Sequence, residues 1–211
     1  MTSAPDACRF LALGDSYTIG EGVNAHDRWP QKIVHALRRE GLRVDDPQII
    51  AVTGWTTDEL AAGMRAVCLK PPYDLVSLCI GVNNQYRGRD VGGYREEFAA
   101  LLERAVHLAG ERPRQVMVVS IPDWGVTRFA REQERDRTAI ARQIDVYNAV
   151  GRDETLRAGA HWADITGLSR ACGDDDDMLA SDGLHPSAAQ YAVWNQRLLP
   201  LARTLLRQQR G

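Results

Sequence analysis

Ser16 is the first residue whose position in the chain suggests chemistry. It closes the motif GDS, which directly follows the apolar run RFLAL. A serine hydroxyl is a weak nucleophile until a neighbouring base removes its proton. His185, on a loop near the other end of the chain, is the best candidate for that base. Asp182, three residues earlier, could fix the tautomer of the imidazole and stabilise its developing positive charge.

Acyl transfer also requires hydrogen-bond donors for the oxyanion, and losing one donor costs roughly 2.7–4 kcal/mol of barrier. Three candidates are the backbone N–H of Ser16, the backbone N–H of Gly54 and the side-chain amide of Asn83. Glycine lets the backbone approach a substrate closely, and an asparagine amide donates without titrating.

Each of these residues also has a purely structural interpretation. Ser16 could cap the helix that follows it, while Gly54, Asn83 and the Asp-Gly pair at 182–183 are typical of turns. A lone histidine is more often structural than catalytic. Catalysis is therefore favoured only if the fold brings these residues together.

The elements that must position them alternate between short apolar runs and longer amphipathic stretches, which predicts an α/β fold. Strands are expected at 9–13, in QIIAVTG, at 74–81, in RQVMVVSIP and in HWADIT. Long helices are expected between them, including one at 132–157 and one at the C-terminal end. This order predicts βαβ units and a mainly parallel sheet with helices on both faces. No internal repeat or linker divides the chain, so residues 1–211 are expected to form one domain.

The candidate residues fall where the predicted strands end. The first strand ends in GDS, the second in TGWTT and the third in GVNN, and SDGLHPS follows the fifth. Ligands of open parallel sheets bind outside the carboxyl ends of the strands. The four segments are therefore expected to share one edge of the sheet.

On these motifs the sequence resembles the SGNH hydrolases, also called GDSL-type esterases or lipases, over nearly the whole chain from GDSYTIG to DGLHPS. The resemblance implies a catalytic triad of Ser16, Asp182 and His185 and an oxyanion hole of Ser16, Gly54 and Asn83. It also implies a flavodoxin-like three-layer α/β/α sandwich with five parallel strands in the order 2-1-3-4-5. The implied reaction is hydrolysis of carboxylic esters through an acyl-enzyme, with no metal and no other cofactor.

Two positions depart from the pattern of the family. Tyr17 stands where the GDSL motif has leucine, and Asn84 stands where G-x-N-D has aspartate. Neither change removes a catalytic group, so both are expected to affect the shape of the pocket. We expect Asp15 to brace the nucleophile turn by hydrogen bonding.

An acyl pocket needs apolar walls near Ser16. Candidate wall residues are Trp55, Tyr86, Trp124 and Phe129, although packing in the core is an equally common use of such aromatics. The segment 122–131 could form a wall or a mobile lid.

Three arginines flank the same edge, namely Arg87, Arg89 and Arg128. They could favour an anionic leaving group, but solvation or pairing with neighbouring acids is the commoner use and the one we expect.

The composition is that of an ordinary globular protein, with 26 basic and 28 acidic residues and a net charge of −2. This balance argues against nucleic acid or an anionic membrane as a partner.

The four cysteines have no zinc-ligand spacing, and the run GDDDDM is typical of a solvated loop rather than of a calcium site. Because the N-terminus has no leader pattern and no apolar run approaches membrane-spanning length, we expect a cytoplasmic protein without stable membrane insertion, provided that no leader was removed. The oligomeric state is left open.

The leading hypothesis is a serine esterase that acts on a small-molecule ester. The substrate is expected to be either a short-acyl ester or a lysophospholipid-like ester. Carbohydrate O-acetylesterase and acyl thioesterase activities on the same fold remain open, as does a non-catalytic module that binds a small ligand. A flavodoxin-like phosphate binder ranks last, because Gly14–Gly22 lacks both a P-loop lysine and G-x-G-x-x-G spacing.

Overall fold

The structure is a computed structural model in which residues 7–173 and 175–208 are described. The N-terminal residues 1–6, on which the prediction about a leader depends, lie outside the described residues. So does Asp174 of the aspartate run.

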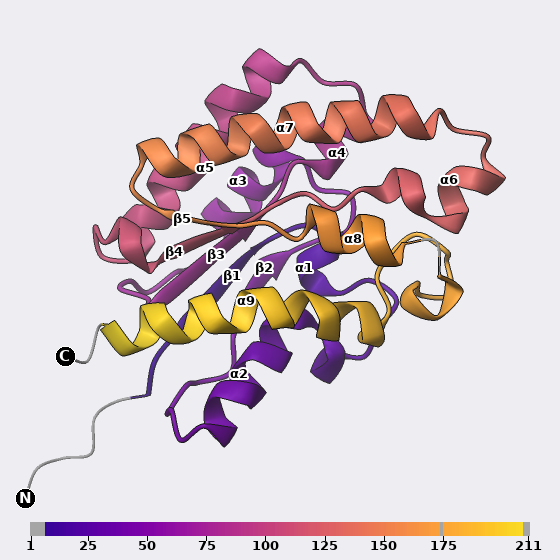
Figure 1. Ribbon diagram of the computed structural model, residues 1–211. Helices are drawn as coiled ribbons and strands as arrows, with labels where there is room; N and C mark the ends of the chain where they lie inside the picture. The colour runs from indigo at the N-terminus through magenta and orange to yellow at the C-terminus, as the bar shows by residue number, and fades with distance from the viewer. Residues whose placement is uncertain (1–6, 174, 209–211) are drawn as a thin grey trace, which may run out of the picture.

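A five-stranded parallel sheet forms the centre of the fold (Figure 1). Its order is β2-β1-β3-β4-β5, which confirms the predicted order and fold class. The strands are β1 (Phe10–Gly14), β2 (Gln48–Ala51), β3 (Leu75–Cys79), β4 (Val116–Val119) and β5 (His161–Ala163). Every residue of β1, β3 and β4 is buried, as expected for a parallel sheet covered on both faces.

The register aligns the carboxyl ends of the three neighbouring strands β2, β1 and β3. Gly14, the last residue of β1, pairs with Ala51 of β2 and with Cys79 of β3. The loops that follow these strands therefore start side by side, which places the GDS, TGWTT and GVNN segments at one edge.

Long helices cover the two faces of the sheet. On one face lie α2 (Trp29–Arg39) and α9 (Ala188–Gln208), and on the other lie α3 (Thr57–Ala66), α5 (Val91–Leu108) and α7 (Arg137–Arg157), as Figure 1 shows. The residues of α5 that face the sheet are buried: Tyr94, Phe98, Leu101, Leu102, Ala105 and Leu108. Together with the sheet these helices make three layers.

Short helices follow four of the strands at the carboxyl edge. They are α1 (Ser16–Ile19) after β1, α4 (Val82–Tyr86) after β3, α6 (Arg128–Glu132) after β4 and α8 (Thr166–Cys172) after β5. The 3₁₀ turns are Ala25–Asp27, Pro113–Gln115, Trp124–Val126 and Asp176–Met178.

The helix predicted at 132–157 is wrong at its start. The chain leaves α6 at Glu132, passes through Glu134 with a φ of 51°, and re-enters a helix only at Arg137. The side chain of Asp136 caps this helix by accepting a hydrogen bond from the Ala139 N–H at 2.9 Å.

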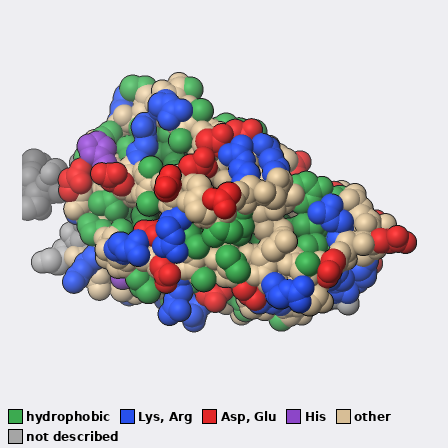
Figure 2. All heavy atoms as spheres, turned by 90° about the horizontal axis from the view of Figure 1, so that it is seen from above, with side chains coloured by type: hydrophobic (Ala, Val, Ile, Leu, Met, Phe, Trp, Pro, Cys, Tyr) green, Lys and Arg blue, Asp and Glu red, His purple; other side chains and the backbone are tan. Residues whose placement is uncertain are grey.

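The face of the molecule above α5 and α7 matches the balanced charge of the sequence. Seen from above the α5–α7 face, acidic and basic side chains are interspersed among apolar ones (Figure 2). In residues 7–173 and 175–208, no helix is both long and apolar enough to cross a membrane.

Candidate active site

The turn after β1 places Ser16 at the start of a helix, where it is largely buried and lines a cavity. Asp15 caps α1, because its Oδ1 accepts the Tyr17 N–H at 3.0 Å, and Ser16 is the first residue of that helix. Ser16 is therefore not the cap, and the capping interpretation applies to Asp15 instead. The first N–H groups of a helix have no acceptor within it. The Ser16 N–H finds no other acceptor in the described part of the chain.

Asp15, next to Ser16 in this turn, is buried, with 1% of its surface exposed. Burial raises its pKa to about 7, although hydrogen bonds from backbone N–H groups oppose the rise. Its contact with Tyr17 supports the expected bracing role, while its side chain does not reach the candidate cavity described below.

Asp182 and His185 form a pair within one turn between the Asp176–Met178 3₁₀ turn and α9. His185 Nδ1 lies 2.6 Å from Asp182 Oδ2, while Asp182 Oδ1 accepts the N–H groups of Leu184 and His185 at 2.9 and 3.0 Å. This arrangement leaves Nε2 as the ring nitrogen able to face a substrate. The ring of Tyr17 packs against the imidazole, with centroids 5.5 Å apart.

The same hydrogen bonds determine the charge of Asp182. Partial burial pushes its pKa upward, but the bonds from the His185 ring and from the backbone N–H groups of Leu184 and His185 outweigh burial and hold the pKa below its ordinary value. The carboxylate is therefore ionised at neutral pH, as an acceptor for an imidazolium must be.

Two further donors lie beside Ser16. Gly54 has a φ of 86°, which favours glycine, and its N–H has no acceptor among the described residues. Asn83 of α4 donates one amide hydrogen to the Trp55 carbonyl at 2.9 Å, which orients the amide and leaves its second hydrogen available. Three donors from the segments that follow β1, β2 and β3 thus border one space.

Asn84 has a structural role instead of the predicted role in pocket shape. It is fully buried, accepts the Thr57 N–H at 3.1 Å and donates to the Thr57 hydroxyl at 2.6 Å. The Thr57 hydroxyl in turn donates to Glu97. An asparagine amide can both accept and donate in this series of hydrogen bonds, whereas an ionised aspartate could only accept.

A cavity of about 220 Å³ joins these groups, with Ser16 and His185 on its wall. The lining residues are Ser16, Tyr17, Thr53, Gly54, Val82, Asn83, Tyr86, Trp124, Phe129, Leu184 and His185. No hydrogen bond joins Ser16 Oγ to His185 Nε2 across the described residues, and such contacts commonly tighten only when substrate binds. Residues from both ends of the chain therefore meet at one cavity.

Three of the four predicted wall aromatics line this cavity. Tyr86 packs edge-on against Trp124 with centroids 5.3 Å apart, and Trp124 lies 6.3 Å from Phe129. Trp124 is also fixed by its Nε1, which donates to Gln85 Oε1 at 2.8 Å.

Trp55 is not on the cavity wall, contrary to our prediction. Its ring covers Gly63 of α3, where an added Cβ would lie only 2.1 Å from the ring. Its contribution to the site is the backbone carbonyl that holds Asn83. Three wall residues were not predicted from the sequence, namely Thr53, Val82 and Leu184, although each is next to a motif residue.

The three arginines at this edge are all paired with acids, as we expected. Arg87 lies 3.2 Å from Glu59, Arg89 lies 2.6 Å from Asp58, and Arg128 lies 3.2 Å from Asp176.

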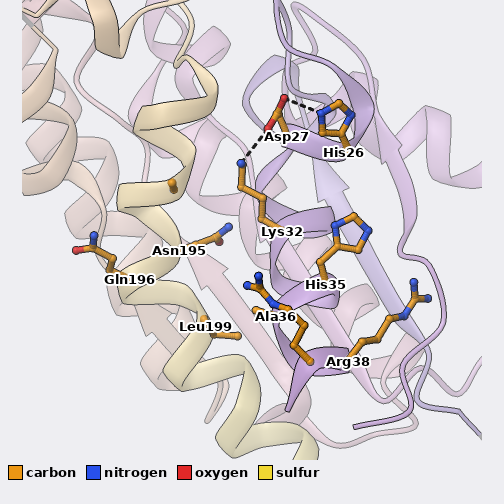
Figure 3. Close-up of a pocket in the computed structure, with 11 residues that line it drawn as sticks. His26, Asp27, Lys32, His35, Ala36, Arg38, Asn195, Gln196 and Leu199 are labelled. Atoms are coloured by element: carbon orange, nitrogen blue, oxygen red, sulfur yellow. Dashed lines mark hydrogen bonds and ion pairs between the residues drawn. The ribbon is translucent and has the colours of Figure 1, made fainter. Parts of the chain in front are cut away.

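A larger hollow, of about 770 Å³, lies between α2 and α9 on one face of the sheet (Figure 3). At the upper end of this hollow in Figure 3, Asp27 pairs with Lys32 at 2.9 Å and with His26 at 3.2 Å. Its walls include none of the candidate catalytic residues. Within the described residues, no group of three or more His, Cys, Asp or Glu is placed to hold a metal ion.

A known protein family matches most of the chain. A model of the GDSL-like lipase/acylhydrolase family matches residues 12–193, a range that includes Ser16, Asp182 and His185. No curated protein matches the sequence significantly.

Solved structures share the fold at low identity. TesA is 19% identical with a TM-score of 0.74, over 94% of this chain and 99% of that one. The lipase/acylhydrolase from Enterococcus faecalis is 21% identical with a TM-score of 0.71, over 95% and 96%. Axe2, an acetylxylan esterase from Geobacillus stearothermophilus, is 18% identical with a TM-score of 0.69, over 92% and 93%.

Proposed function

Because the chain belongs to the GDSL-like lipase/acylhydrolase family, and is therefore a carboxylic ester hydrolase, we propose that it cleaves esters of short-chain acids through an acyl-enzyme on Ser16. The observation that carries this proposal is that Ser16 and His185 line one cavity together with Gly54 and Asn83.

In the proposed mechanism, Ser16 Oγ attacks the ester carbonyl while His185 Nε2 takes the hydroxyl proton. Asp182 holds the imidazole through Nδ1 and stabilises its positive charge. The oxyanion of the tetrahedral intermediate accepts hydrogen bonds from the N–H groups of Ser16 and Gly54 and from the amide of Asn83.

Collapse of the intermediate breaks the bond to the leaving oxygen, to which His185 returns the proton. The alcohol departs and leaves an acyl group on Ser16. Water then attacks the acyl carbonyl with His185 as base, and a second collapse releases the carboxylic acid and restores the serine.

The size of the cavity supports the short-chain assignment. Its volume of about 220 Å³ lies below the roughly 300–1,000 Å³ usual for pockets that enclose a drug-sized ligand. The aromatic rings of Tyr86, Trp124 and Phe129 bound it, so a long acyl chain would need them to move.

Sugar acetates are the second candidate substrate class. The same small cavity suits an acetyl group, and the fold is shared with Axe2, an acetylxylan esterase. A lysophospholipid is disfavoured by its long acyl chain, while a short acyl thioester fits the same space.

The test is a panel of matched esters and thioesters with acyl chains from acetyl to dodecanoyl, with an acetylated xylo-oligosaccharide as a further arm. The proposal predicts highest kcat/KM at two to six carbons and loss of turnover in Ser16→Ala. A preference for dodecanoyl substrates would overturn the short-chain assignment. Unchanged turnover in Ser16→Ala would contradict the mechanism, and binding without turnover in wild type would indicate a non-catalytic module.

A further inference from the structure

The turn that carries Asp182 and His185 is tied to the short helix α6. The Phe129 N–H donates to the Gly183 carbonyl at 2.9 Å, and Arg128 Nη2 donates to the Ser181 carbonyl at 3.2 Å. Across the described residues, these are the hydrogen bonds that residues 181–183 receive from outside their own turn. One helix therefore anchors both sides of Asp182.

Arg128 also lies against the backbone of that turn. A Cβ added to Gly183 would lie 2.7 Å from Arg128 Nε, and the φ of Gly183 is 69°. Two features thus favour glycine at position 183, namely its backbone conformation and the close approach of the Arg128 guanidinium.

Two acidic side chains also contact the guanidinium. Arg128 Nη1 lies 3.2 Å from Asp176 Oδ1, and Arg128 Nε lies 3.7 Å from Glu132 Oε1. Asp176 belongs to the 3₁₀ turn Asp176–Met178, which precedes the turn that carries Asp182 and His185. Arg128 therefore links these two turns. Its side chain is about one-third exposed, at 32%.

The internal hydrogen bonds of the turn set its shape but not its position. The Ala180 N–H donates to the His185 carbonyl at 2.7 Å and the Gly183 N–H to the Ala180 carbonyl at 2.9 Å. These bonds would move with the turn if it shifted as a unit. The distance between His185 and Ser16, by contrast, depends on contacts with the rest of the protein.

We propose that Arg128 is a positioning residue, which fixes the Asp182–His185 turn relative to Ser16 and so sets the rate of the chemical step. This inference rests on the proposed function. It also assigns α6 two tasks, because Phe129, the next residue, lines the cavity. The segment 122–131 then acts as a fixed wall coupled to the catalytic turn, rather than as a mobile lid.

The test compares Arg128→Gln, Arg128→Lys and Asp176→Asn with wild type on an activated butyryl ester. Arg142→Gln on α7 is the matched control, because it removes the same charge from an exposed position away from the cavity. Misplacement of a catalytic group by about 1 Å can cost on the order of 100-fold. We therefore expect kcat to fall about 10- to 100-fold in Arg128→Gln, with KM changed less than about twofold, and partial recovery in Arg128→Lys. Asp176→Asn should lower kcat less, in the same direction.

A second readout does not depend on turnover. We expect the proton between His185 Nδ1 and Asp182 Oδ2 to give a low-field ¹H NMR signal. This signal should broaden or move in Arg128→Gln and stay unchanged in Arg142→Gln. Unchanged kcat and signal in a folded Arg128→Gln would overturn the proposal, as would an effect confined to KM. If wild type lacked esterase activity, the proposed function would fail, while the NMR comparison would still test whether Arg128 positions the turn.

Discussion

Asp182 Oδ2 and His185 Nδ1 lie 2.6 Å apart within the turn that carries both residues. Asp182 also accepts two backbone N–H groups of this turn, so its carboxylate is held independently of Ser16. Ser16, in contrast, is placed by β1 and α1 at the other end of the chain. The Asp182–His185 pair forms within one turn, whereas the Ser16 hydroxyl comes from a segment far away in the sequence. The pair and the hydroxyl can therefore be tested separately.

Asp182→Asn should leave the fold intact but lower kcat about 1,000- to 10,000-fold, since an amide can hold the imidazole in the wrong tautomer and cannot stabilise its charge. Steady-state kinetics on a short-chain ester measure the effect. A loss below tenfold would remove Asp182 from the proposed triad.

The depressed pKa of Asp182 also has a consequence for stability. A carboxylate whose pKa is lower in the folded protein contributes stability above the pKa of the unfolded chain, which is lost as the pH falls through the folded value. Wild type should therefore lose stability relative to Asp182→Asn below about pH 4, as measured by urea unfolding. Parallel curves for the two proteins down to pH 2 would contradict the assigned shift.

Asn83→Ala should lower kcat about 100- to 1,000-fold with little change in KM, because the amide is proposed to bind the oxyanion more strongly than the ground-state carbonyl. Asn83→Asp, which keeps the size but removes the donor, should be equally impaired. An effect confined to KM would point to a role in substrate binding instead.

Phe129→Ala should shift the preference toward longer acyl chains, because the ring bounds the small cavity. We expect the ratio of kcat/KM for hexanoyl over acetyl esters to rise at least about tenfold. Trp55→Phe is the matched control, since the Trp55 ring lies on Gly63 and should leave this ratio unchanged. Equal shifts in both variants would show that the ratio reports general loosening.

For Asp15 we expect stability to depend on pH with the opposite sign to that of Asp182. Its pKa is raised to about 7 by burial, so its contribution to stability is fully present below the unfolded value near 3.8 and is lost as the pH rises to about 7. Wild type should therefore lose up to about 4 kcal/mol relative to Asp15→Asn over that range, at about 1.4 kcal/mol per pKa unit. Urea unfolding from pH 4 to 8 measures the difference, and a constant difference would refute the shift.

Sequence periodicity predicted the sheet and its helices because the buried strands are short apolar runs and the core faces of α5 and α9 follow helical spacing. In α9 the apolar residues at this spacing are buried, namely Tyr191, Trp194, Leu198, Ala202, Leu205 and Leu206. The break before α7 was missed because the charged residues between α6 and α7 suit either a loop or an exposed helix. Asp136 is nevertheless a capping signal.

The candidate site was predictable where it depends on strand ends. Ser16, Gly54, Asn83 and His185 follow strands or sit in the last loop, and the parallel topology brings them together. Trp55 was misplaced because neighbouring residues in a turn point in different directions. The anchoring contacts of Arg128 were missed because they depend on how α6 meets the 181–183 turn, which no local pattern records.

The central claim, that His185 activates Ser16, is tested most directly by the rate at which a fluorophosphonate labels the protein, with the site identified by mass spectrometry. The account predicts rapid labelling at Ser16 in wild type, none at this position in Ser16→Ala, and a rate lowered at least about 1,000-fold in His185→Ala. Labelling of Ser16 at the same rate in folded His185→Ala and wild type would contradict it.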